Sequence, residues 1–167
     1  MNRVLSGSRS LLAMFVCLFM VGIGMAPVAI HAQDAPAVTL TKISSDPFTV
    51  PPGQHATEVE PHVLANGSTQ VAAFQTGRIA PGGATAIGWA TSADGGTTWT
   101  HGFLPGLTVG NGSGPYSAAS DPAVAYDAKH AVWMIASLPI SNTSETPAMV
   151  VSRSTDGGFT WNDPVSV

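Results

Sequence analysis

The 167-residue chain contains a single cysteine, Cys17, and only 10% of its residues are charged. One cysteine cannot close an intrachain disulfide, so the fold has to be stabilised by packing. Six Lys and Arg residues stand against ten Asp and Glu residues. A surface so poor in cations argues against binding to nucleic acid or to anionic lipid. His62, His101 and His130 fall at no metal-ligand spacing, so we expect no metal and no cofactor.

An eight-residue pattern, Ser-x-Asp-x-Gly-x-Thr-Trp, is present twice, at 92–99 and at 154–161. Glycines supply the positive φ of a tight hairpin, and a short carboxylate accepts hydrogen bonds from its own turn. The Trp then covers the turn with a large apolar surface. The pattern therefore predicts two structural turns, formed by Ser92, Asp94, Gly96, Thr98 and Trp99 and by Ser154, Asp156, Gly158, Thr160 and Trp161.

This pattern resembles the Asp-box, or bacterial neuraminidase repeat, of the sialidase superfamily and related β-propellers. In those proteins the box connects the third and fourth strands of a blade, on the outer rim away from the substrate face. The resemblance implies an all-β fold, a β-propeller of four-stranded antiparallel blades. It implies a reaction only indirectly, because the box is structural.

The repeat extends upstream of each box, since Glu60-Pro61-His62 corresponds to Asp121-Pro122-Ala123. Apolar runs of about four to six residues, rich in Val and aromatics and bounded by turn residues, predict strands rather than helices. We expect a blade at 60–105, a connecting loop at 106–120 and a second blade at 121–167. Propellers close with roughly four to eight blades. The chain is therefore expected to be the amino-terminal part of a longer protein, or alternatively to assemble as several copies in a ring.

The first residues are typical of export. Basic Arg3 and Arg9 precede an apolar run and small residues, which predicts a signal peptide over 1–32 and a secreted, extracellular or periplasmic protein. A retained membrane anchor is the alternative, because the uncharged stretch 11–30 is long enough to span a bilayer. The lead-in at 33–59 contains an alternating stretch, 37–43, which is either a strand that completes the last blade or part of a flexible linker.

Three residues are candidates for chemistry on the face opposite the boxes. Glu60 and Asp121 hold equivalent positions, so they are either an acid/base or cation-binding pair or carboxylates that open the first strands by bonding backbone N–H groups. Arg78 is either a carboxylate clamp for an acidic sugar or a solvated charge. The Gly-rich loop 110–117 lacks the Lys of a phosphate loop, and it either cradles a ligand or simply connects blades.

Sialidases carry an Arg-Ile-Pro motif in the first blade, and this chain has Val59-Glu60-Pro61 at the matching place. They also place an acid/base Asp before the first box, whereas no carboxylate lies between Arg78 and Asp94. Tyr116 cannot be assigned to the nucleophile of later blades. The chain thus resembles secreted sialidase-like Asp-box proteins without a complete catalytic site. We expect part of a glycoside hydrolase-like protein, inactive alone; the alternatives are a non-catalytic propeller that binds glycan or protein, and a truncated product without function.

Overall fold

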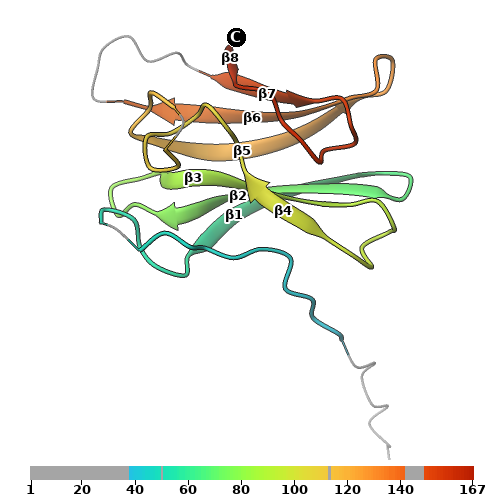
Figure 1. The fold of residues 1–167 in the computed structure, drawn as a ribbon, viewed down its shortest axis with the longest axis horizontal. Coiled ribbons are helices and arrows are strands. Elements are labelled where there is room, and N and C mark those ends of the chain that lie inside the picture. Colours follow the sequence, from blue (N-terminus) through green and yellow to red (C-terminus); the bar gives the residue numbers. More distant parts are fainter. Residues whose placement is uncertain (1–37, 50, 113, 142–148) are drawn as a thin grey trace, which may run out of the picture. The chain divides into compact units, whose positions relative to one another are not determined.

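Strands separated by short turns account for the regular structure of this protein (Figure 1). The computed structural model describes residues 38–49, 51–112, 114–141 and 149–167, and these residues contain eight strands and no helix. The strands are β1 (Glu58–Asn66), β2 (Thr69–Arg78), β3 (Ala84–Ser92), β4 (Thr100–Phe103), β5 (Ala118–Asp127), β6 (Val132–Ile140), β7 (Val150–Ser154) and β8 (Val165–Ser166).

The strands form two antiparallel meanders. β1 to β4 pair consecutively, β5 to β8 pair consecutively, and one residue pair, Ala84 with Ala119, joins β3 to β5. Figure 1 shows the two meanders as layers, β1–β4 below and β5–β8 above. The fold is therefore all-β, with two four-stranded blades of a β-propeller, fewer than the roughly four to eight that close one.

The first strand of each blade begins earlier than the sequence predicts. β1 begins at Glu58 instead of residue 60, and β5 begins at Ala118 instead of residue 121. The expected connecting loop 106–120 is shortened accordingly, at its carboxyl end. The physical reason is that Glu60-Pro61 and Asp121-Pro122 do not open these strands but lie at irregularities inside them.

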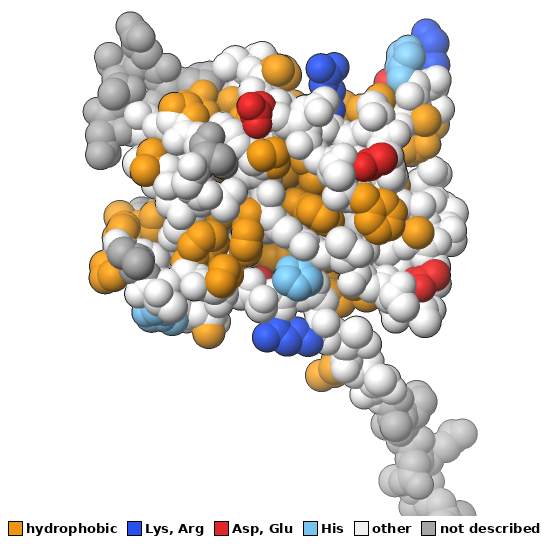
Figure 2. All heavy atoms as spheres, viewed as in Figure 1, with side chains coloured by type: hydrophobic (Ala, Val, Ile, Leu, Met, Phe, Trp, Pro, Cys, Tyr) orange, Lys and Arg blue, Asp and Glu red, His pale blue; other side chains and the backbone are white. Residues whose placement is uncertain are grey.

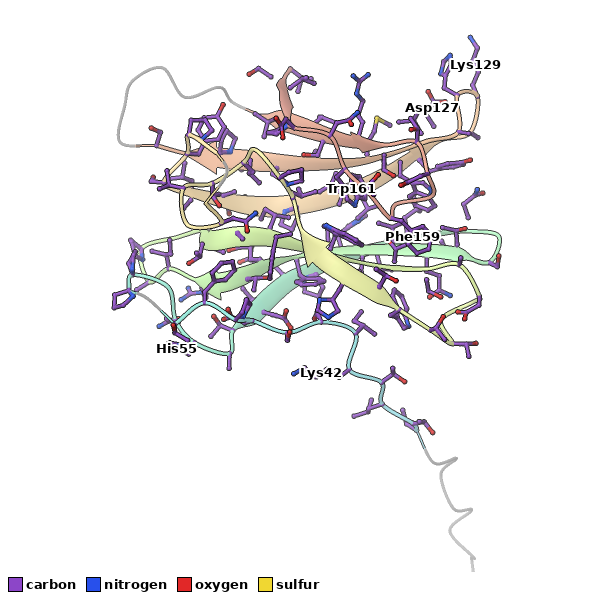
Figure 3. All side chains as sticks on the ribbon, viewed as in Figure 1. Lys42, His55, Asp127, Lys129, Phe159 and Trp161 are labelled. Carbon is purple, nitrogen blue, oxygen red and sulfur yellow. The ribbon has the colours of Figure 1, made fainter. Side chains whose placement is uncertain are left out.

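The main core lies between the blades. Blade 1 contributes Val71, Ala73, Ile87 and Trp89, and blade 2 contributes residues of β5, β6 and β7 together with Trp161. The rings of Trp89 and Trp161 are 6.5 Å apart, and Figure 3 shows Trp161 between the two layers. Aromatic pairs at this distance add to the free energy gained by burying their area.

Side-chain hydrogen bonds also cross this boundary. Thr91 Oγ1 donates to the carbonyl of Gly158 at 2.7 Å, and the backbone N–H of Val124 donates to His62 Nδ1 at 3.1 Å. Both join residues more than sixty positions apart. They fix the second blade against the first at the end of β3 and in the middle of β1.

The outer side of blade 2 is the repeat equivalent of the inner side of blade 1. By the spacing of the two boxes, Met149 and Val151 correspond to Ile87 and Trp89. Ile87 and Trp89 are 1% and 7% exposed, whereas Met149 is 40% exposed and Val151 is half-buried. Blade 2 thus presents outward the kind of apolar face that blade 1 buries.

The lead-in does not contain the strand considered for 37–43, because none of the described residues 38–49 is in a strand. From Ile43 onward the lead-in is not a free linker either. Ile43 packs on the outer side of blade 1, and the ring of Phe48 lies 5.0 Å from that of Phe103. The Asp46 carboxylate accepts hydrogen bonds from the N–H groups of Phe48 and Thr57 at 2.8 and 3.0 Å. Prolines at 47, 51 and 52 lack the N–H that a sheet ladder needs, which favours this irregular path.

The predicted signal peptide at 1–32 lies outside the described residues. Among the residues that the structure does describe, no helix is both long and apolar enough to cross a membrane.

Candidate functional site

The first box folds as the sequence predicts, around one carboxylate. Asp94 Oδ1 accepts from Ser92 Oγ and from the N–H of Thr98, both at 2.8 Å, and Asp94 Oδ2 accepts from Thr98 Oγ1 at 2.6 Å. Ser92 Oγ in turn accepts from the N–H of Gly96 at 2.8 Å. The indole of Trp99 donates to the Gly96 carbonyl at 2.9 Å and closes the turn.

The second box repeats this arrangement atom for atom. Ser154 Oγ donates to Asp156 Oδ1 at 2.7 Å, the N–H of Thr160 donates to the same oxygen at 3.0 Å, and Thr160 Oγ1 donates to Oδ2 at 2.6 Å. The N–H of Gly158 donates to Ser154 Oγ, and the Trp161 indole donates to the Gly158 carbonyl at 3.1 Å. Both turns lie between the third and fourth strands of their blades.

These contacts determine the charge of the two acids. Hydrogen bonds from the Thr98 side chain, the Thr98 backbone and Ser92 lower the pKa of Asp94 to about 2. Burial acts in the opposite direction on Asp156, but hydrogen bonds from Thr160 and Ser154 outweigh it and lower the pKa of Asp156 to about 2 as well. A carboxylate that stays ionised with both oxygens engaged by its own turn is a poor proton donor or base. The boxes are structural.

Glu60 and Asp121 occupy matching β-bulges, which the sequence did not reveal. The pairing register shifts between Val59 and His62 in β1 and between Ser120 and Ala123 in β5. Glu60 and Asp121 have positive φ angles of 53° and 48°, an unfavourable backbone for residues other than glycine. The idea that these acids open their strands is therefore wrong. Bulges commonly redirect a side chain, and they are frequent next to active sites.

The partners of the two acids differ. Glu60 Oε2 accepts a hydrogen bond from Nε2 of Gln75, a side chain that is only 2% exposed, whereas Asp121 Oδ1 accepts from Ser120 Oγ at 3.0 Å. β1 and β5 are not paired in the sheet, but they pack against each other, so the two bulges lie on strands in contact. The structure thus places two exposed carboxylates at equivalent positions of adjacent first strands, each with one polar side-chain partner.

Arg78 is the last residue of β2, and its backbone is fixed by the lead-in. Its N–H donates to Thr57 Oγ1 and its carbonyl accepts from the N–H of Gln54, both at 2.8 Å. Because β2 runs antiparallel to β1, Arg78 lies at the end of blade 1 where β1 begins, close in register to Glu58. It therefore shares an end of the blade with Glu60, opposite the end that carries the first box.

The described residues of the Gly-rich loop, 110–112 and 114–117, fold back on the preceding residues. The N–H of Val109 donates to the carbonyl of Tyr116 at 2.8 Å, and a β carbon on Gly114 would lie 2.2 Å from the backbone of Leu107. Such close approach explains a glycine at this position. The loop is a packed connection whose outer side, with the lead-in, borders a cavity of about 640 Å³. Sequence reasoning missed the lead-in's part in that cavity, for which Phe48 between two prolines was the available signal.

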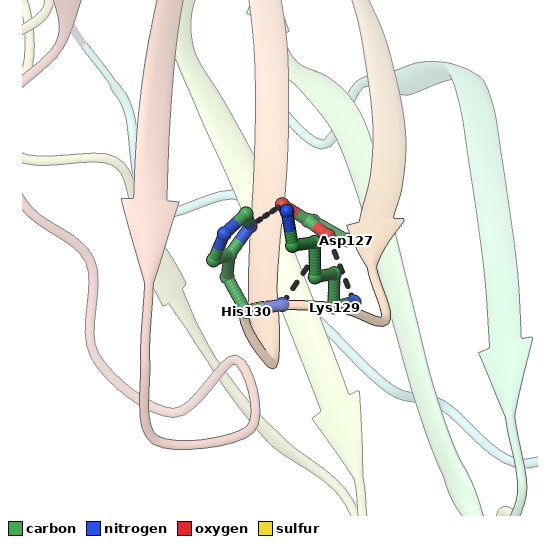
Figure 4. Close-up of polar contacts among 3 residues, drawn as sticks. All are labelled: Asp127, Lys129 and His130. Carbon is green, nitrogen blue, oxygen red and sulfur yellow. Dashed lines mark hydrogen bonds and ion pairs between the residues drawn. The ribbon is translucent and has the colours of Figure 1, made fainter.

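Asp127 and His130 interact at the opposite end of β5 (Figure 4). Asp127 Oδ2 lies 2.5 Å from His130 Nδ1, and Oδ1 accepts from the N–H groups of Lys129 and His130 at 2.9 and 3.3 Å. The hydrogen bond from the His130 side chain is the main reason why the pKa of Asp127 is lowered. Asp127 thus caps an exposed turn. In the described ranges no three His, Cys, Asp or Glu side chains gather as metal ligands would.

The surface carries few charges. On the face drawn in Figure 2, hydrophobic side chains and the white atoms of the backbone and of uncharged side chains cover most of the area, and charged side chains are few. This face therefore has no strongly charged patch that would attract a polyelectrolyte.

Comparisons with known proteins extend to the fold only. No protein-family model and no curated protein sequence matches the chain. Among solved structures, a Hadza microbial sialidase, Hz136, is similar at 22% identity and a TM-score of 0.48 over 64% of this chain and 25% of its own length. An exo-β-1,3-galactanase from Phanerochaete chrysosporium, solved with galactose, has 14% identity and a TM-score of 0.43 over 75% of this chain and 29% of its own. The chain thus spans under a third of either protein.

Proposed function

We propose that this chain supplies two blades of a secreted, glycoside hydrolase-like β-propeller related to exo-α-sialidases, and that carbohydrate is bound where Glu60 and Asp121 lie. The observation that carries the proposal is the pair of matching bulges. A non-glycine residue at positive φ is maintained at a cost of about 1–3 kcal/mol, and such strain concentrates at functional sites. In the described ranges four non-glycine residues have positive φ: Ala56 and Ala131 lie in turns, whereas Glu60 and Asp121 lie inside strands, at equivalent bulges.

Carboxylates suit this function chemically. They accept hydrogen bonds from sugar hydroxyls, and paired carboxylates are the acid/base and nucleophile groups of most glycosidases. The four box carboxylate oxygens are already engaged, so Glu60 and Asp121 are the acids that are better placed to meet a ligand. The proposed site also lies away from the rim that carries the boxes, in agreement with the resemblance to Asp-box propellers.

Further blades are part of the proposal. The apolar outer side of blade 2, with Met149 and Val151, matches the side of blade 1 that blade 2 covers, so another blade-like sheet is the natural neighbour. A full acid/base set then requires residues beyond the two blades. Export through the segment 1–32 belongs to the same proposal.

A non-catalytic glycan-binding propeller is the second candidate. It is favoured by one observation: Val59-Glu60 stands in the first strand where the resemblance to sialidases calls for Arg-Ile, so Val59 replaces the Arg that grips the substrate carboxylate and an acid follows it. An acid at this place disfavours an acidic sugar and suits a neutral one.

The test is binding and turnover by the whole chain, with lactose and 3′-sialyllactose as ligands in calorimetric titration. We expect measurable binding that Glu60→Gln and Asp121→Asn each weaken at least tenfold. Asp127→Asn, which changes an acid at the other end of β5, serves as the matched control and leaves binding unchanged. A fluorogenic sialoside should give no turnover. Hydrolysis that Asp121→Asn abolishes would show that the site is complete; equal effects of all three variants would show that neither carboxylate contacts the sugar.

A further inference from the structure

A second candidate site lies outside the carboxylate pair, in the 640 Å³ cavity at the end of blade 1 opposite the first box. Three parts of the chain enclose it: the lead-in, the start of the hairpin between β2 and β3, and the loop after β4. The volume falls in the range of about 300–1,000 Å³ that is usual for small-molecule sites. Its apolar lining consists of Pro47, Phe48, Pro51, Pro52, Ile79 and Val109.

Contacts behind the lining hold the walls in place. Thr108 Oγ1 donates to the Thr85 carbonyl at 2.6 Å, which ties the loop after β4 to the start of β3. A β carbon on Gly110 would lie 2.4 Å from Thr85 Cγ2, so this glycine lets the loop approach β3 closely. On the other side, Gly53 bridges to Ile79, and the ring of Phe48 packs against that of Phe103 at an angle of 55°. The cavity is thus preformed and does not depend on a ligand to assemble it.

The side chains that line the cavity restrict the charge and the hydrogen-bonding groups of a ligand. None of the ten lining residues is charged, so nothing in the wall compensates the desolvation of an ionic group. Two of the hydroxyls already donate elsewhere: Thr85 Oγ1 donates to the Gly77 carbonyl at 2.9 Å, and Ser117 Oγ donates to the Ile140 carbonyl at 2.8 Å. A hydroxyl whose hydrogen is committed offers its lone pairs, so both oxygens accept from a ligand.

We propose that this cavity binds an uncharged small molecule with an apolar ring face and a hydroxyl or N–H donor. The ring packs against Phe48, Ile79 and the prolines, and the donor reaches the oxygen of Thr85 or Ser117. The inference goes beyond the proposed carbohydrate site, because none of the lining residues belongs to the carboxylate pair or to the boxes.

The probe is N-phenyl-1-naphthylamine, a neutral fluorophore with aromatic rings and one N–H, titrated into the full chain. Its counterpart 8-anilinonaphthalene-1-sulfonate has the same rings and a negative charge. We expect saturable binding of the neutral dye at one site and at least tenfold weaker binding of the sulfonate. Absence of saturable binding, or equal affinity for the two dyes, overturns the proposal.

Two exposed valines provide a matched pair of variants. Val109 lines the cavity and is 61% exposed, whereas Val63 on β1 is 60% exposed and is not among the lining residues. Val109→Lys places a charge at the apolar wall and should weaken dye binding at least tenfold. Val63→Lys adds the same charge elsewhere and should leave it unchanged. Retained binding in Val109→Lys, or an equal loss in both variants, refutes the site. Glu60→Gln and Asp121→Asn should not alter dye binding, so failure of the carbohydrate site and failure of this cavity are distinguishable.

Discussion

The two boxes offer a direct test of how the blades pack, because equivalent glycines differ only in their surroundings. Gly96 and Gly158 have φ angles of +93° and +92° and occupy the same position of the turn. A β carbon on Gly96 would meet the flexible amide end of Gln70 at 3.3 Å. A β carbon on Gly158 would meet Val71 Cγ2 at 2.8 Å and Thr91 Oγ1 at 3.0 Å, across the boundary between the blades.

The expected magnitudes follow from this difference. Alanine in a left-handed conformation costs about 1–2 kcal/mol at either position. Gln70 can move aside, so Gly96→Ala should lower the free energy of unfolding by little more than this conformational cost. Val71 and Thr91 are both 0% exposed and cannot yield without disturbing the core, so Gly158→Ala should cost a further 1–3 kcal/mol or so for overpacking. The Thr91–Gly158 hydrogen bond, with a net contribution of about 1 kcal/mol, is weakened at the same time.

The measurement is urea denaturation of both variants and the parent chain, followed by tryptophan fluorescence. Trp161 closes the second box and lies 6.5 Å from Trp89 of blade 1, so the signal reports on the blade boundary itself. We expect the free energy of unfolding to fall clearly more in Gly158→Ala than in Gly96→Ala. Equal losses would refute the reasoning, because they would mean that the second box is not wedged against blade 1.

Two further predictions concern the boxes and the blade boundary. The pKa values of Asp94 and Asp156 are lowered from 3.8 to about 2, so the stability that these carboxylates contribute is complete above about pH 4 and is lost as the pH falls through about 2. The melting temperatures of the parent and of Asp156→Asn should therefore converge between pH 4 and pH 2, and a gap that does not change with pH would contradict this. His62→Ala removes the acceptor of the buried Val124 N–H and should cost about 1–3 kcal/mol in chemical denaturation, a loss that an unchanged midpoint would disprove.

The boxes could be predicted from the sequence because their interactions are local. Every hydrogen bond that Asp94 and Asp156 make to the turn comes from residues within four positions of the acid. Residue types and their spacing are therefore enough to predict the conformation of these two turns. The same holds for the apolar runs that became β2 and β3, whose turns are marked by glycines.

The bulges could not be predicted, because they depend on pairing across strands. Nothing in Glu60-Pro61 or Asp121-Pro122 shows that β1 already begins at Glu58 and β5 at Ala118. The extra residue is defined only against the partner strand. The cavity could not be predicted for a similar reason: Phe48 and Val109 are 61 positions apart and line the same cavity only because the lead-in folds against blade 1.

The outer side of blade 2 repeats the features by which blade 1 contacts blade 2. Thr91 is the last residue but one of β3 and donates to the box of the next blade; the equivalent residue of β7 is Arg153, which is exposed. A guanidinium is also a donor, with a longer reach than a hydroxyl. The apolar positions beside it, Met149 and Val151, repeat Ile87 and Trp89. Both the apolar surface and the donor that hold blade 2 on blade 1 are thus present again on the outer side of blade 2, in the order in which a following blade would use them.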